Sequence, residues 1–171
     1  MLIAHLAACA PDPSELVFGG PDCPAATSED AVAWSTTSRE GPTLAIMEVY
    51  AQDDGEGEVD WIELFNYGDE PVDLADVQLE DFDSAEADDV FAFEGALEPE
   101  AWFEVPCTRT GSTGFALKDG GQTVALVVGG DTVKDRVGWG PQTAGRSSAR
   151  VLRDGCPTWV TAEPTRAAPN E

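Results

Sequence analysis

The chain has 171 residues, of which 42% are hydrophobic and 8% aromatic, so it can bury the core of one domain. Asp and Glu number 33 against 9 Lys and Arg, and the resulting charge of −24 excludes a broad electrostatic footprint on nucleic acid or on anionic lipid. The single histidine, His5, lies in the N-terminal apolar stretch. The folded part therefore holds neither a histidine triad nor a histidine-ligated zinc site.

The N-terminus has the pattern of a bacterial lipoprotein signal. Residues 6–9 read Leu-Ala-Ala-Cys, an aliphatic residue and two small residues before a cysteine. We expect a signal peptide over residues 1–9, a diacylglycerol on the thiol of Cys9 as the one contact with a bilayer, and a location in the cell envelope. No basic residue precedes Cys9, so we expect the true signal to begin further upstream. The alternative is a short apolar terminus without a role in export.

The remaining chain is predicted to be a tether followed by an all-β domain. Residues 10–42 are rich in Pro, Gly and Ser and show no sustained apolar periodicity, which predicts a flexible, extended linker, with a short ordered piece near residues 31–34 as the one exception considered. From residue 43 to 170, short runs of alternating apolar residues are separated by Gly, Pro and Asp. Many short strands at this spacing indicate an antiparallel β-sandwich or barrel. The predicted strands are 44–51, 59–66, 72–79, 90–93, 102–105, 123–128, 132–137, 148–152 and 158–161.

One strand motif resembles a known family. Residues 60–66 read Asp-Trp-Ile-Glu-Leu-Phe-Asn, and this run is similar to the signature strand of the lamin tail domain. Related motifs follow in order up to residue 170, so the resemblance covers nearly the whole predicted domain. It implies an immunoglobulin-like β-sandwich, which in bacteria occurs on secreted or surface proteins and is not known as a catalyst. The motif residues that the resemblance singles out are Asp60, Trp61, Glu63, Asn66, Arg150 and Asn170.

Glu63 and Asn66 are the motif residues with the clearest chemistry. On a strand of period two, Glu63 shares a face with Trp61 and Phe65, so its carboxylate needs a partner if that face is covered. The family pattern implies Arg150, whose guanidinium can meet a carboxylate through two hydrogen bonds. A catalytic carboxylate is the alternative role for Glu63. Asn66 is expected to bond the backbone of a turn.

The four cysteines agree with an exported protein. If Cys9 is acylated, three remain, and we expect a disulfide between Cys107 and Cys156 because both lie in the predicted domain. If Cys9 is not acylated, four cysteines allow three pairings. The alternative for Cys107 and Cys156 is that both are buried thiols.

Two acidic clusters, residues 53–60 and 80–89, could supply oxygen ligands to Ca²⁺, the one metal considered for this chain. Neither cluster has the spacing of an EF-hand. The alternative is a pair of solvated loops kept soluble by their charge, with no cofactor at all. The candidate ligands are Asp54, Glu56, Glu58, Asp81 and Asp83.

These observations predict a non-enzymatic cell-surface lipoprotein that binds, adheres or docks through loops or an uncovered sheet edge. The partner is a protein or a surface polymer, and not nucleic acid. Catalysis is not expected because the sequence shows no nucleophile next to a base. The alternatives are a Ca²⁺-stabilised extracellular binding module and a carboxylate-based hydrolase, which needs two acids in one cleft.

Overall fold

The computed structural model describes residues 13–19, 23, 33–52, 59–82, 90–108 and 116–170. Among these residues, no helix is long and apolar enough to cross a membrane. The described elements are α1 (Glu15–Phe18), β1 (Ala33–Thr37), β2 (Leu44–Tyr50), β3 (Asp60–Asn66), β4 (Val72–Asp73), β5 (Val77–Asp81), β6 (Val90–Ala92), β7 (Ala96–Leu97), β8 (Trp102–Cys107), β9 (Gln122–Val128), β10 (Thr132–Trp139), β11 (Ser147–Arg153) and β12 (Cys156–Ala162).

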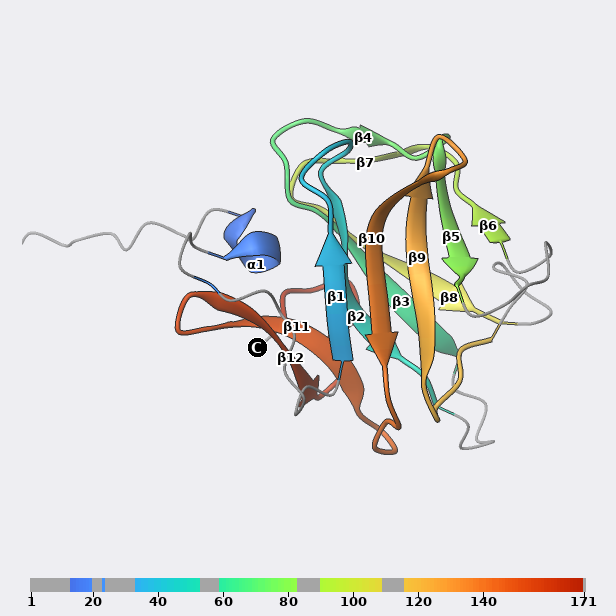
Figure 1. Ribbon diagram of the computed structural model, residues 1–171, viewed down its shortest axis with the longest axis vertical. Helices are drawn as coiled ribbons and strands as arrows, with labels where there is room; N and C mark the ends of the chain where they lie inside the picture. Colours follow the sequence, from blue (N-terminus) through green and yellow to red (C-terminus); the bar gives the residue numbers. More distant parts are fainter. Residues whose placement is uncertain are drawn as a thin grey trace, which may run out of the picture.

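Two antiparallel sheets pack face to face (Figure 1). One sheet, named here the β9 sheet, has the strand order β1-β10-β9-β5-β6, and the other, the β2 sheet, has the order β12-β11-β2-β3-β8. The short strands β4 and β7 pair with each other at one end of the sandwich. This architecture confirms the predicted immunoglobulin-like β-sandwich.

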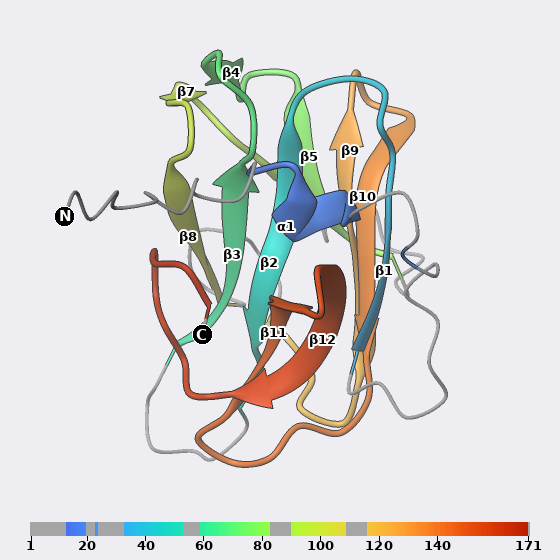
Figure 2. The same cartoon turned by 90° about the vertical axis from the view of Figure 1, so that its left-hand side faces the viewer.

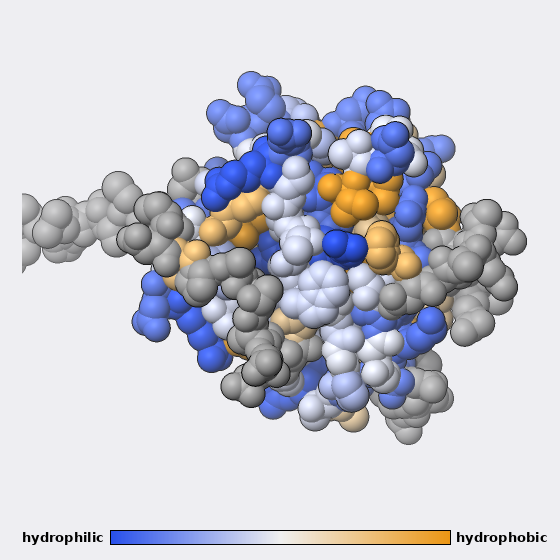
Figure 3. All heavy atoms as spheres, in the orientation of Figure 1, coloured by the Kyte–Doolittle hydropathy of each residue, from blue (hydrophilic) through white to orange (hydrophobic). Residues whose placement is uncertain are grey.

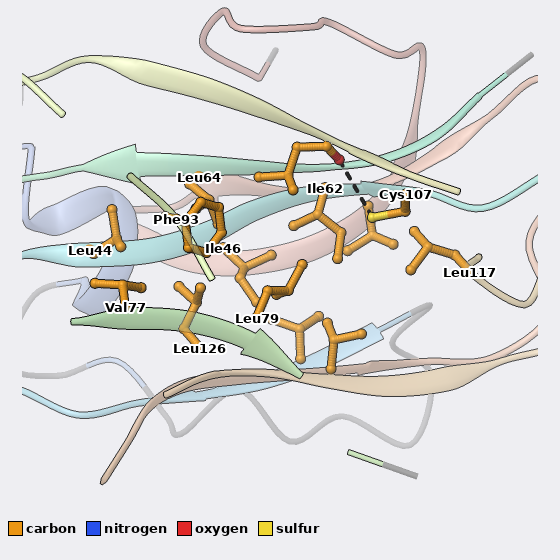
Figure 4. Close-up of a cluster of buried hydrophobic side chains, with 14 of the residues drawn as sticks. Leu44, Ile46, Ile62, Leu64, Val77, Leu79, Phe93, Cys107, Leu117 and Leu126 are labelled. Atoms are coloured by element: carbon orange, nitrogen blue, oxygen red, sulfur yellow. Dashed lines mark hydrogen bonds between the residues drawn. The ribbon is translucent and has the colours of Figure 1, made fainter. Parts of the chain in front are cut away.

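The core lies between the sheets because alternate residues of each strand turn inward. Ile46 and Leu64, which lie opposite each other on β2 and β3, point towards Leu79 of β5 and Leu126 of β9 (Figure 4). All four side chains are fully buried. Each contributes on the order of 1.5–3 kcal/mol to stability by leaving water.

The predicted strands all reappear with shifted ends, and one of them is divided. The strand predicted over residues 72–79 is interrupted by a turn in which the Val77 amide donates to the Leu74 carbonyl at 3.0 Å. Residues 72–73 therefore pair with β7, while residues 77–81 join the β9 sheet. Strand β7 was not predicted, because two residues are too short to show a period.

The predicted tether over residues 10–42 is wrong in part, because two of its segments belong to the folded domain. Strand β1 pairs with β10 from Ala33 to Thr37. The residues of β1 that face inward are Ala, Ser and Thr, whereas Trp34 points outward. A strand usually buries its large apolar residues, and β1 does the opposite. Helix α1 lies in front of β2 (Figure 2), where Val17 packs with Met47 and Phe65 on the outer face of the β2 sheet.

The predicted disulfide between Cys107 and Cys156 is wrong. Cys156 is bonded to Cys23, with the two Cα atoms 5.4 Å apart. Cys107 is instead buried in the core at the end of β8, where its thiol donates to the Val105 carbonyl at 3.5 Å (Figure 4). Cys156 starts β12 in a hairpin at the edge of the β2 sheet, so the bond ties the N-terminal segment to that hairpin.

Candidate functional site

Three glutamates form a row across the outer face of the β2 sheet. Glu48 of β2 lies directly opposite Glu63 of β3, and Glu63 lies opposite Glu104 of β8. Glu48 and Glu63 are fully buried although they face away from the core between the sheets. Something other than the sandwich itself must therefore cover them.

The C-terminal segment, residues 163–170, is that cover. The hydroxyl and the amide of Thr165 both donate to Oε2 of Glu48, and the hydroxyl of Ser147 donates to Oε1. Asn170 fastens the segment, because its Nδ2 donates to the Met47 carbonyl at 3.0 Å and to the Arg150 carbonyl at 3.1 Å. Figure 2 shows the C-terminal end of the chain beside β3.

Burial of this row changes the protonation of Glu63. Loss of water and, secondarily, the charge of Glu48 raise the pKa of Glu63 from 4.5 to about 8, so it is mainly neutral at pH 7. The backbone N–H groups of Ala167 and Ala168 face it and lower its pKa in part, yet neither carboxyl oxygen accepts a hydrogen bond of good geometry. A hydrolase needs such an acid pair in a cleft, and both side chains are closed off from solvent.

The ion pair expected between Glu63 and Arg150 is wrong, because the two side chains lie on opposite faces of the β2 sheet. Arg150 enters the interior and pairs with Asp135 of β10, Nη2 to Oδ2 at 3.4 Å. Asp135 also accepts from the Ile46 amide at 2.8 Å and from the Thr37 hydroxyl at 2.8 Å. Arg150 and Asp135 therefore join the two sheets from within.

Asn66 closes the turns at one end of the sandwich, as its motif predicts. Its Nδ2 donates to the carbonyls of Glu70, Leu97 and Glu98 at 2.8–3.1 Å. Its Oδ1 accepts from the Thr43 hydroxyl at 2.7 Å and from a turn amide. The residue is fully buried, so no part of it is available to a ligand.

Asp60 and Trp61 are structural as well. Asp60 accepts from the amides of Gln52 at 2.8 Å and Leu117 at 3.1 Å, and so holds two connections at the end of β3. The ring of Trp61 stacks on Tyr50, with centroids 5.6 Å apart. The guanidinium carbon of Arg166 lies 5.7 Å from the centre of the Trp61 ring.

A hollow of about 530 Å³ lies beside this stack. Among the described residues, no carboxylate, cysteine, serine, threonine or lysine lines it. Its lining consists of Tyr50, Trp61, Gly145, Pro164 and Arg166.

The predicted Ca²⁺ ligands and the predicted acylation site fall mostly outside the described residues: Cys9, Asp54, Glu56, Glu58 and Asp83. Asp81 is described, and it is buried at the end of β5 with Lys118 Nζ 3.7 Å from its Oδ2. Within the described ranges, no group of three or more acidic, cysteine or histidine side chains is arranged to hold a metal ion. The Ca²⁺ site stays a prediction.

The outer face of the β9 sheet differs from that of the β2 sheet, because it exposes large aromatic side chains. Trp34 of β1 lies opposite Gly138, Gly138 lies opposite Thr123, and the Phe82 amide donates to the Thr123 carbonyl at 2.9 Å. Trp34 and Phe82 therefore lie at the two ends of one row of residues, which crosses β1, β10, β9 and the end of β5. Trp34 is 39% exposed and Phe82 is 45% exposed.

Arg136 lies between these two aromatic rings. Its guanidinium carbon is 5.8 Å from the centre of the Trp34 ring and 4.7 Å from that of Phe82. The indole of Trp34 reaches over Gly138, where a Cβ atom would lie 2.5 Å from the ring. We call Trp34, Arg136 and Phe82 the aromatic strip. Figure 3 shows the side of the molecule on which Figure 1 draws β1 and β10 in front, and there pale and orange side chains interrupt the hydrophilic blue surface.

The aromatic strip was not predicted from the sequence. Trp34 falls in the segment interpreted as a tether, and Phe82 falls in a cluster interpreted as acidic. The strand over residues 132–137 was predicted, and its alternation places Arg136 on the outer face. The strip forms only because β1 pairs with β10, and no local pattern in the sequence indicates that pairing.

Comparison with known proteins identifies the family. The family model described as Lamin Tail Domain matches residues 37–141, more than half of the chain. The chain belongs to the lamin tail domain family. The immunoglobulin-like fold of a lamin tail domain is typically a non-catalytic binding domain. A search of the curated proteins found no match to this lamin tail domain protein.

Proposed function

We propose that this lamin tail domain protein is a non-enzymatic binding module, displayed at the cell envelope and anchored to the bilayer through acylated Cys9. The observation that carries the binding role is the aromatic strip. Single exposed hydrophobic residues are normal on a protein surface, but two exposed aromatics with an arginine between them are the residue types of binding hot spots. The partner is a protein or a surface polymer that covers this strip.

The contrast between the two outer faces supports the proposal. On the β2 sheet, α1 and the C-terminal segment cover the face so fully that every residue of β2 and β3 is buried. On the β9 sheet, Trp34 and Phe82 keep large exposed areas. A chain that covers one apolar face with its own segments and exposes aromatics on the other has a surface suited to a partner.

The cysteines of the N-terminal segment and the net charge of the chain support display outside the cytosol. A disulfide such as Cys23–Cys156 is typical of oxidising compartments. The Leu-Ala-Ala-Cys run that ends at Cys9 is the pattern expected of an acylation site. A charge of −24 keeps an exposed protein soluble and away from anionic surfaces.

The binding role is tested with the full chain carrying Cys9→Ser, so that membrane insertion does not contribute. Sedimentation with envelope fragments of the producing cells should show binding by this protein and at least tenfold weaker binding by the Trp34→Ala/Phe82→Ala variant. Phe103→Ala, which removes an aromatic exposed to 40% on the β2 sheet, is the control and should bind normally. Equal binding by all three proteins would contradict the proposal.

Anchoring is tested separately by metabolic labelling with radioactive palmitate. The wild-type chain should carry the label and remain in the membrane fraction, whereas Cys9→Ser should lose both. Membrane retention of an unlabelled wild-type chain would show that the acyl anchor is wrong, and the binding result above would be unaffected.

A further inference from the structure

We infer that the aromatic strip binds carboxylate-bearing sugar units of an acidic polysaccharide; this inference rests on the proposed binding function and names its ligand. The charged group that recognises the ligand is Arg136. The apolar faces of the sugar rings lie on Trp34 and Phe82.

Arg136 differs from the other described cations because it lies over two exposed aromatic rings. Lys118, Arg146, Arg150 and Arg166 each have a carboxylate oxygen within 4.0 Å. Arg136, like Arg39, Lys134 and Arg153, has none among the described residues. A guanidinium that lies over two exposed rings and has no carboxylate among the described residues can pair with a carboxylate of a ligand.

The position of Arg136 prepares it for a carboxylate. The guanidinium is held over the Trp34 and Phe82 rings, and its Nε is buried without a hydrogen-bond partner among the described residues. The Nη groups point away from this buried atom and can donate to both oxygens of one carboxylate. Because the guanidinium is already held in place, less side-chain entropy is lost when the ligand binds.

The spacing of the two aromatics suits an extended chain of rings. Trp34 and Phe82 end a row that crosses three gaps between neighbouring strands, so their backbones are about 14 Å apart. The residues between them, Gly138 and Thr123, are small. A polysaccharide can therefore lie across the strands, with the C–H faces of its sugars on the two aromatic rings and a carboxylate over Arg136.

The net charge of the protein distinguishes among the possible anionic partners. Duplex DNA carries one charge per about 1.7 Å along its axis and is repelled by a protein of charge −24. A second copy of this chain carries the same −24 and is repelled as well. A polysaccharide with at most one carboxylate per sugar has a lower charge density, and at physiological salt the repulsion is screened beyond about 8 Å.

The test measures binding of the full chain, with Cys9→Ser, to polygalacturonate in 0.15 M NaCl by affinity electrophoresis. The matched probe is the same polymer with its carboxylates methyl-esterified. We expect at least tenfold stronger binding to polygalacturonate than to the ester. Arg136→Met keeps the length of the side chain but removes its charge, and should abolish this preference. Arg153→Met, at an exposed cation on β11, should leave the preference unchanged.

Several results would overturn the inference: no binding to polygalacturonate, equal binding to the ester, or a preference that survives in Arg136→Met. The sedimentation assay with envelope fragments distinguishes failure of this inference from failure of the proposed function. If strip-dependent binding to the envelope is lost after protease treatment and is not competed by polygalacturonate, the partner is a protein, and only the ligand assignment falls. If the strip has no role in envelope binding, the proposed function falls.

Discussion

The carboxyl groups of Glu48 and Glu63 face each other across β2 and β3, beneath the C-terminal segment. Two ionised carboxylates in such a place would repel each other without water to screen them. The arrangement therefore depends on a proton at Glu63, while Glu48 is stabilised by the hydroxyls of Ser147 and Thr165. The family motif residue Glu63 thus acts as a neutral, buried group.

The first prediction concerns pH. The pKa of Glu63 rises on folding from 4.5 to about 8. Between these two pH values the folded state therefore binds more protons than the unfolded state, and the free energy of unfolding falls as the pH rises. The slope is at most about 1.4 kcal/mol per pH unit. Glu63→Gln cannot ionise, so it should match the wild type near pH 5 and be more stable at pH 9.

Urea unfolding at pH 5, 7 and 9 measures this difference. Glu94→Gln, at an exposed glutamate outside the row, is the control and should follow the wild-type pH dependence. Parallel curves for the wild type and Glu63→Gln would show that Glu63 does not titrate in this window.

The second prediction concerns the ion pair inside the sandwich. Asp135→Asn leaves the buried guanidinium of Arg150 without a counter-charge, and such a change typically costs about 3–5 kcal/mol. Glu163→Gln, which removes an exposed ion pair with Arg146, should change stability little. Thermal unfolding of both variants gives the comparison, and a similar small effect for both would refute the role of Asp135.

The third prediction concerns the disulfide. Peptide mapping without reduction should recover Cys23 linked to Cys156. Cys23→Ser should lower stability by about 2–4 kcal/mol, because the bond closes a long loop of the unfolded chain. Cys107→Ala should leave the Cys23–Cys156 peptide intact. Recovery of a Cys107–Cys156 peptide would contradict the structure.

The fourth prediction concerns Asn66. Asn66→Asp keeps the acceptor oxygen for Thr43 but places a carboxylate oxygen against three backbone carbonyls. Unpaired buried polar groups cost about 1–3 kcal/mol each, so the loss should be several kcal/mol. Thr43→Val removes a single hydrogen bond and should cost about 1 kcal/mol. The two urea midpoints check this order, and equal midpoints would be inconsistent with it.

Prediction from the sequence succeeded where the information is local. The strand at residues 60–66 has its own alternation and its own motif, so both its type and its family could be predicted. Strand β1 could not, because the hydrogen bonds of Ser35 and Thr37 with Trp159 and Asp135 stabilise its polar inward side. Those partners are distant in the chain and carry no local signal.

The amino-acid order by itself determined the all-β class, the family and the turn role of Asn66, because alternation and turn residues act over a few neighbouring positions. Only the tertiary structure decided which cysteine bonds Cys156, which carboxylate pairs with Arg150, and that Trp34, Arg136 and Phe82 meet on one face. These contacts join segments far apart in the chain. Their geometry depends on how the two sheets pack, which no short stretch of sequence specifies.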